Sequence, residues 1–143
     1  MSSKILEVVG LVLWWAEGSK SRKDKRWKNA WTYPVEITNT DPRVIQIFLR
    51  LLREEIKVDE ERIKLQIQIH KGDKQKQLED YWCVVSGIPR KRLQRTIVRP
   101  VGNKIGKTNG TCKIRCSGKE IYGKLQSKLS DILDELRGVA QSG

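Results

Sequence analysis

The sequence predicts an α+β fold in which helices pack on one face of an antiparallel sheet. Two segments, 62–70 and 111–117, alternate between apolar and polar residues, as strands with one buried face do. Around them lie segments whose apolar residues recur at helical spacing. With 143 residues the chain has room for one core. We therefore expect a single domain over residues 1–138 and a frayed tail over 139–143.

The first segment, residues 3–16, is expected to form a helix that stops before Gly18. Its apolar residues lie on nearly every side of that helix, so all sides need cover. Two interpretations satisfy this requirement: a core position within one domain, or a partner chain on the side that the domain leaves open. A basic segment at 19–31 and a strand at 33–39 follow.

The later elements are marked by their ends and by their periodicity. Asp41 and Pro42 are the residue types of a helix N-cap and of a first helical position. Apolar residues continue from there at helical spacing to Ile56. The elements expected after this second helix are a strand at 62–70, a helix at 74–86 that Gly87 ends, a strand within 90–100, a loop at 101–110, a strand at 111–117 and a helix at 119–136.

Charge indicates the class of partner. The chain carries 29 Lys and Arg against 17 Asp and Glu, a formal net charge of +12. So much positive charge favours a polyanion, with nucleic acid as the first expectation and an anionic membrane surface as the second. No apolar run reaches the roughly 18 residues of a membrane span. Three cysteines make no closed disulfide framework, so we expect a cytoplasmic, nucleoid-associated protein that is not secreted.

The exposed faces of the two alternating strands carry no acid. Lys, Arg, Gln, Ser and Thr bond to base edges and phosphates, and a two-stranded β-ribbon fits the DNA major groove. An ordinary solvated sheet face is the alternative, although such faces usually mix both signs of charge. The residues concerned are Arg62, Lys64, Gln66, Gln68 and His70 on one strand, and Thr111, Lys113, Arg115 and Ser117 on the other.

A carboxylate ends the first helix. Glu17 lies where the helix dipole is negative, which disfavours an acid. A divalent cation would reverse that preference, because carboxylates and helix-end carbonyls are both hard oxygen ligands. One Glu is a poor site, whereas two copies that meet across a twofold axis make a good one. A solvated Glu beside a turn is the alternative. No glycine-rich phosphate loop follows a strand, so nothing supports nucleotide-driven chemistry. No small-molecule substrate is expected.

These segments together resemble a known family. GLVLWWAEGSK, then VEITNTDPRVIQIFLRLLREEI, KLQIQIH and YWCVVSGIP are similar to the LAGLIDADG homing endonucleases, in particular to the compact members with one motif per chain. The resemblance runs from about Gly10 to Leu133. Ala16-Glu17-Gly18 matches the Ala-Asp-Gly end of the family signature, with Glu in place of the commoner Asp. The large Trp14 and Trp15 also depart from the small residues that the family prefers where its helices cross.

The resemblance implies a homing-endonuclease-like fold and a definite activity. Members form a saddle-shaped antiparallel sheet that sits in the DNA major groove, and two copies join through their N-terminal helices. The implied function is a double-strand break in DNA, made by a homodimer at a near-palindromic site with Mg²⁺, or another divalent ion such as Mn²⁺. Glu17 is then the catalytic, metal-binding acid, Ala16 adds a carbonyl, and a supporting cation comes from Lys20, Arg99 or Lys113. The implied double-stranded DNA contacts are Lys20, Arg22, Lys23, Lys25, Arg26, Lys28, Arg62, Lys64, Gln66, Gln68, His70, Arg99, Lys113 and Arg115.

Two other functions remain open at this point. A protein of the same fold that has lost cleavage would act as a DNA-binding regulator or as an RNA-splicing maturase. A basic structural or RNA-associated protein keeps the charge argument without the metal site.

Overall fold

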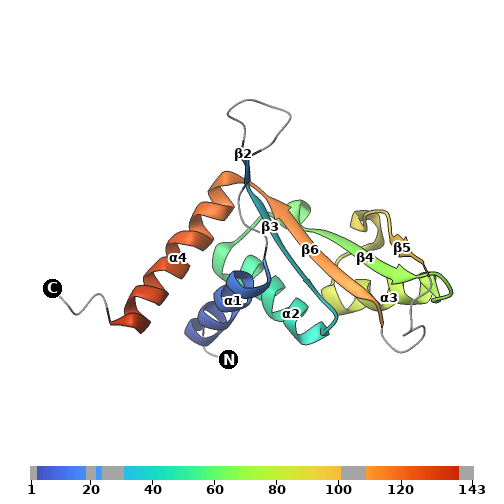
Figure 1. The fold of residues 1–143 in the computed structure, drawn as a ribbon, viewed down its shortest axis with the longest axis horizontal. Helices are drawn as coiled ribbons and strands as arrows, with labels where there is room; N and C mark the ends of the chain where they lie inside the picture. The colour runs from blue at the N-terminus through green and yellow to red at the C-terminus, as the bar shows by residue number, and fades with distance from the viewer. Residues whose placement is uncertain (1–2, 19–21, 24–30, 101–108, 139–143) are drawn as a thin grey trace.

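A four-stranded mixed sheet forms the centre of the molecule (Figure 1). A computed structural model describes residues 3–18, 22–23, 31–100 and 109–138. The sheet has the order β3-β6-β4-β5, with β6 antiparallel to both of its neighbours and β5 parallel to β4. A separate antiparallel pair joins β1 and β2. The strands are β1 (Arg22–Lys23), β2 (Trp31–Thr32), β3 (Pro34–Asn39), β4 (Lys64–His70), β5 (Ile97–Arg99) and β6 (Thr111–Ser117).

The parallel pair corrects the expectation of a wholly antiparallel sheet. Between β4 and β5 the chain passes through α3, which packs against β4 and returns the chain in its original direction. A strand, a crossover helix and a second strand connected in this way run parallel. The α+β class is confirmed, and the sheet is antiparallel everywhere except at its β5 edge.

The helices begin and end close to the predicted positions. The Asp41 carboxylate accepts the Arg43 N–H at 2.9 Å and caps α2, whose first residue is Pro42. Gly87 ends α3 in the left-handed region, at φ 69°. The helical elements are α1 (Ser3–Glu17), α2 (Pro42–Arg50), the π-helical η1 (Leu51–Ile56), the 3₁₀ turns η2 (Glu60–Arg62) and η3 (Arg90–Arg92), α3 (Gln75–Ser86) and α4 (Lys119–Arg137).

Alternation along the strands gives the sheet a buried face, called the dry face below, and a solvent-exposed face, called the open face, as predicted. On the dry face lie side chains such as Ile37, Leu65 and Ile114, all fully buried against the helices. The predicted strand at 62–70 is shorter in the structure, because residues 60–62 form a 3₁₀ turn and β4 starts at Lys64. The opposite face of the sheet therefore carries the polar residues of β3, β4 and β6.

Helix α1 is buried against the rest of the domain on one side and exposed on the other. Leu11 and Trp14 are buried, and Trp14 packs edge-on against Tyr122 of α4. Gly10 lies so close to η1 that an added Cβ would come within 2.9 Å of the Leu51 Cβ. The other side of α1 remains an exposed apolar stripe, which consists of Ile5, Val9, Val12 and Trp15.

Within the described ranges no helix is both long and apolar enough to cross a bilayer.

Candidate nucleic-acid interface

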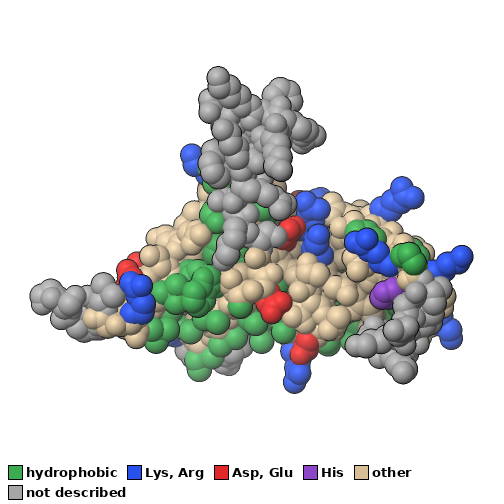
Figure 2. Space-filling model, in the orientation of Figure 1, with side chains coloured by type: hydrophobic (Ala, Val, Ile, Leu, Met, Phe, Trp, Pro, Cys, Tyr) green, Lys and Arg blue, Asp and Glu red, His purple; other side chains and the backbone are tan. Residues whose placement is uncertain are grey.

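The polar residues predicted on the two strands come together on the open face of the sheet. The register of β4 against β6 places Lys64 opposite Arg115 and Gln66 opposite Lys113. Ladder partners project to the same side of a sheet, so these side chains form continuous rows. Figure 2 shows Lys and Arg side chains over the half of the molecule that carries β4 and β5, while hydrophobic side chains gather on the half that carries α1 and α4. The rows continue into β3 with Glu36 and Thr38, and into β5 with Ile97 and Arg99.

The cations on this face differ in how the fold uses them. The Arg115 Nε lies 3.9 Å from a Glu36 carboxylate oxygen, which offsets part of its charge. Arg99 donates weakly to the Gln68 amide oxygen at 3.4 Å. Lys64 and Lys113 have no hydrogen-bond or ion-pair partner in the described part of the chain. The two lysines are therefore the cations of this face that are most available to an external anion.

Arg62, predicted to contact DNA, is held by the protein itself. Its guanidinium lies 2.7 Å from the Glu120 carboxylate, and it also donates to the Ser117 carbonyl. These contacts join η2, the end of β6 and the start of α4. Because Glu120 already neutralises Arg62, this residue stabilises the rim of the sheet more than it adds to the open positive charge.

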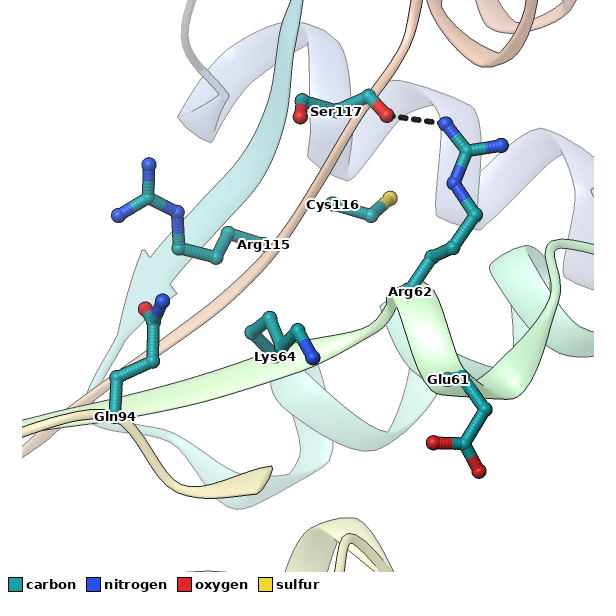
Figure 3. Close-up of a pocket in the computed structure, with 7 residues that line it drawn as sticks. All are labelled: Glu61, Arg62, Lys64, Gln94, Arg115, Cys116 and Ser117. Carbon is teal, nitrogen blue, oxygen red and sulfur yellow. Dashed lines mark hydrogen bonds between the residues drawn. The ribbon is translucent and has the colours of Figure 1, made fainter. Parts of the chain in front are cut away.

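A hollow of about 490 Å³ opens at this rim (Figure 3). Figure 3 shows the side chains of Arg62, Lys64 and Arg115 around it, with Gln94 at the left of the view. Gln94 was not among the predicted site residues. Its backbone N–H donates to the Leu65 carbonyl at 2.7 Å, which fixes the segment after η3 beside β4. No local sequence pattern predicts this contact, because the hydrogen bond joins segments almost thirty residues apart along the chain.

The end of α1 is fixed at the β3 edge of the sheet. Gly18 donates to the Trp14 carbonyl at 2.7 Å and forms an isolated antiparallel bridge with Ile37 of β3. Ala16 and Glu17 are both exposed, and Glu17 has no ion pair with any described residue. The bridge therefore places the Glu17 carboxylate beside the strand whose open face carries Glu36 and Thr38.

Glu17 and the end of α1 fit a cation only in part. The last carbonyls of a helix lack partners within the helix, so carboxylate and carbonyl oxygens are available together there. Across the described residues, however, no three acid, His or Cys side chains gather around a common point. One chain thus supplies one carboxylate, and a divalent ion would need further oxygen ligands from a second copy or from a phosphate.

The sheet order separates the predicted supporting cations. Arg99 belongs to β5, at the opposite edge from β3 and therefore from Glu17. Lys113 belongs to β6, next to β3, and pairs with Thr38. Among the described candidates, Lys113 belongs to the strand nearer to β3 and therefore to the end of α1. Lys20, Lys25, Arg26 and Lys28 lie outside the described residues, and Arg22 and Lys23 form β1.

The cysteines of β6 belong to the core. Cys112 and Cys116 project to the dry face and are buried. Burial raises the pKa of Cys116 to about 11 and raises that of Cys112 as well. Both thiols therefore stay protonated at neutral pH and pack as small apolar side chains.

Comparison of this chain with known protein families, curated proteins and solved structures finds no match. The resemblance to the LAGLIDADG endonucleases therefore depends on the sequence motifs alone. The geometry adds an open sheet face whose Lys64 and Lys113 have no partner among the described residues, and an exposed carboxylate at the end of the first helix.

Proposed function

We propose that this chain is a divalent-metal-dependent DNA endonuclease that acts as a homodimer on a near-palindromic site. The observation that carries the proposal is the position of Glu17. An exposed carboxylate at the end of an apolar helix lies at the edge of a sheet face that presents Lys64, Lys113 and Arg115.

The open sheet face supports DNA as the partner. Adjacent antiparallel strands are the right width for the major groove, where their side chains can reach base edges. Lys64 and Lys113 supply phosphate contacts, and the neighbouring Gln66 and Gln68 supply the amides that pair with adenine. Positive charge over this face would draw in the duplex and make affinity depend on salt.

The apolar stripe of α1 supports a second copy as the partner of this helix. The stripe leads along α1 to Glu17, so two copies joined there would bring their Glu17 carboxylates toward one twofold axis. Glu17 and the Ala16 carbonyl of each copy would hold Mg²⁺ or Mn²⁺. Such an ion activates water and stabilises the leaving oxygen when it is bound. Lys113, next to β3, is the described residue best placed to stabilise charge on the phosphate.

Substitution of Glu17 tests the proposal. A plasmid library with a randomised insert is incubated with the protein and Mg²⁺, and cut molecules are recovered to define a site. On that site Glu17→Gln should abolish nicking and linearisation while duplex affinity stays within about twofold of wild type. Glu135→Gln, an equivalent change at an exposed position of α4, serves as the control and should cleave normally. Full cleavage by Glu17→Gln refutes the assigned role.

The DNA-binding face does not require Glu17, which keeps a second function open. If the protein binds duplex DNA through Lys64 and Lys113 but cuts no site with Mg²⁺ or Mn²⁺, it is a cleavage-silent regulator of the same fold. Tighter binding to structured RNA than to duplex DNA supports a maturase or another RNA-associated role.

A further inference from the structure

An apolar side chain, that of Ile97, lies among the polar rows of the open face. In the parallel pair of β4 and β5, Ile97 is the partner of Gln68 and Val98 is the partner of Ile69. Ile69 is buried against the helices, whereas Gln68 belongs to the open face. Because ladder partners project to the same side, Ile97 shares the open face and Val98 points to the opposite side, where the sheet edge leaves it 50% exposed.

Ile97 borders a small hollow among the polar rows. The hollow measures about 30 Å³ and spans all four strands of the sheet. Thr38, Gln66, Gln68, Thr111 and Lys113 contribute polar side chains to it, and Ile97 stands at its β5 end. An apolar group is thus surrounded by hydrogen-bonding groups, as expected of a surface that reads a mixed apolar and polar pattern.

The residues just before Ile97 are fixed from both sides of the sheet. On the helix side, Thr96 donates to the Glu79 carboxylate of α3, which also accepts from Arg90 at 2.7 Å. On the open side, the Gln66 amide donates to the Arg95 carbonyl at 3.0 Å. Ile97 is therefore held in place before any ligand arrives, and a preorganised contact loses little entropy on binding.

We propose that Ile97 is a specificity-determining residue that contacts the 5-methyl group of a thymine in the major groove. The inference rests on the proposed binding of duplex DNA by the open face. The thymine methyl is the one apolar feature in the major-groove pattern of the four base pairs, and apolar side chains recognise it. Gln68 and Thr111, which border the same hollow, can bond to the polar edges of the neighbouring bases.

The test removes the methyl group from the DNA. Wild type, Ile97→Ala and Val98→Ala each select duplexes from a randomised pool, and every thymine of the selected site is then replaced in turn by deoxyuridine. For wild type we expect one replacement in each half-site to lower affinity about fourfold, the factor for one buried methyl group. Ile97→Ala should show no such loss, and Val98→Ala, the adjacent residue on the other side, should behave as wild type.

Two results would overturn the inference. If no deoxyuridine replacement affects binding by the wild-type protein, Ile97 contacts no thymine methyl. This measurement uses only the wild-type protein, so it does not depend on whether a variant folds. If Ile97→Ala is as sensitive as wild type, another residue makes the contact. In both cases DNA binding that depends on Lys64 and Lys113 leaves the proposed function intact. If wild type binds duplex no better than Lys64→Ala and Lys113→Ala do, the proposed function fails and the inference fails with it.

Discussion

Lys64 and Arg115 face each other directly across β4 and β6 on the open side of the sheet. Like charges in this position destabilise a strand pair. Glu36, on the other side of Arg115, lies 3.9 Å away and offsets only one of the two charges. A phosphate backbone bound across both side chains would relieve any repulsion between these two charges.

Removal of the Lys64 charge should separate binding from stability. For Lys64→Ala we expect weaker duplex binding and a salt dependence whose slope falls by about one unit, because one phosphate contact is lost. The free energy of unfolding should stay equal or rise by a few tenths of a kcal/mol, since the repulsion with Arg115 disappears. Fluorescence anisotropy over a series of salt concentrations measures the first effect, and urea denaturation measures the second.

Lys76→Ala provides the matched control. Lys76 is exposed on α3, which packs on the opposite side of the sheet, so this variant loses the same charge away from the open face. Its salt slope should equal that of wild type. Equal losses of affinity in the two variants would mean that overall charge, and not the open face, governs binding.

The position of Glu17 depends on the residue that follows it. A Cβ on Gly18 would lie 2.7 Å from the Trp14 Cδ1 and closer still to the Trp14 carbonyl oxygen, a backbone atom that cannot easily move. Gly18→Ala should therefore displace the end of α1 from β3 and cost about 1–3 kcal/mol of unfolding free energy. Cleavage should fall by a larger factor than duplex affinity, as single-turnover cleavage and anisotropy would show.

Gly123→Ala is the control for this substitution. An added Cβ at Gly123 meets nothing within 4 Å, and the residue lies inside α4. Alanine favours a helix interior over glycine, so this variant should gain about 0.5–1 kcal/mol and keep full cleavage. A Gly18→Ala protein as active as Gly123→Ala would contradict the role given to the Gly18 backbone.

The alternation of apolar and polar residues predicted the parts of the site that lie on the long strands. Alternation in 64–70 and 111–117 already determines which side chains share the open face, because strand periodicity is a local property. The three residues of β5 are too few to show a period. The orientation of Ile97 follows from the crossover through α3, which no window of sequence around Ile97 contains.

Long-range pairing explains the other differences. Arg62 reads as a free strand cation in the sequence, yet its partner Glu120 lies 58 residues further along the chain. The position of Glu36 opposite Arg115 likewise depends on the register of β3 against β6, which the sequence around Glu36 does not show. The number of charges is counted directly in the sequence, whereas their arrangement on the surface depends on these long-range pairings.

A buried carboxylate on α3 should make stability depend on pH. Burial by itself raises the pKa of Glu79, but hydrogen bonds from Thr96, Arg90 and Gln75 outweigh burial and hold that pKa below its ordinary value. A lowered pKa stabilises the fold fully above the ordinary carboxyl range, and this contribution is lost as the pH falls through the folded-state pKa. Glu79→Gln should cost about 2 kcal/mol at pH 7, and the difference from wild type should shrink under acid conditions in urea denaturation.

Asp80→Asn is the comparison for Glu79→Gln. Asp80 pairs with the same Arg90, but its side chain is 57% exposed. Exposed ion pairs contribute little, so this variant should lose less than about 1 kcal/mol. A larger loss for Asp80→Asn than for Glu79→Gln would show that Arg90, and not the buried carboxylate, organises the segment before β5.

The exposed stripe of α1 predicts how the protein assembles. Val9 is 39% exposed there, so Val9→Glu should leave the monomer folded while placing two like charges against each other at a twofold interface. We expect wild type to sediment as a dimer on duplex DNA, and Val9→Glu to sediment as a monomer that no longer cuts both strands. Val84→Glu, at an 83% exposed position of α3, should remain dimeric and active. A wild-type protein that is monomeric on its site, or a dimeric Val9→Glu, would remove α1 from the interface and leave each Glu17 without its counterpart.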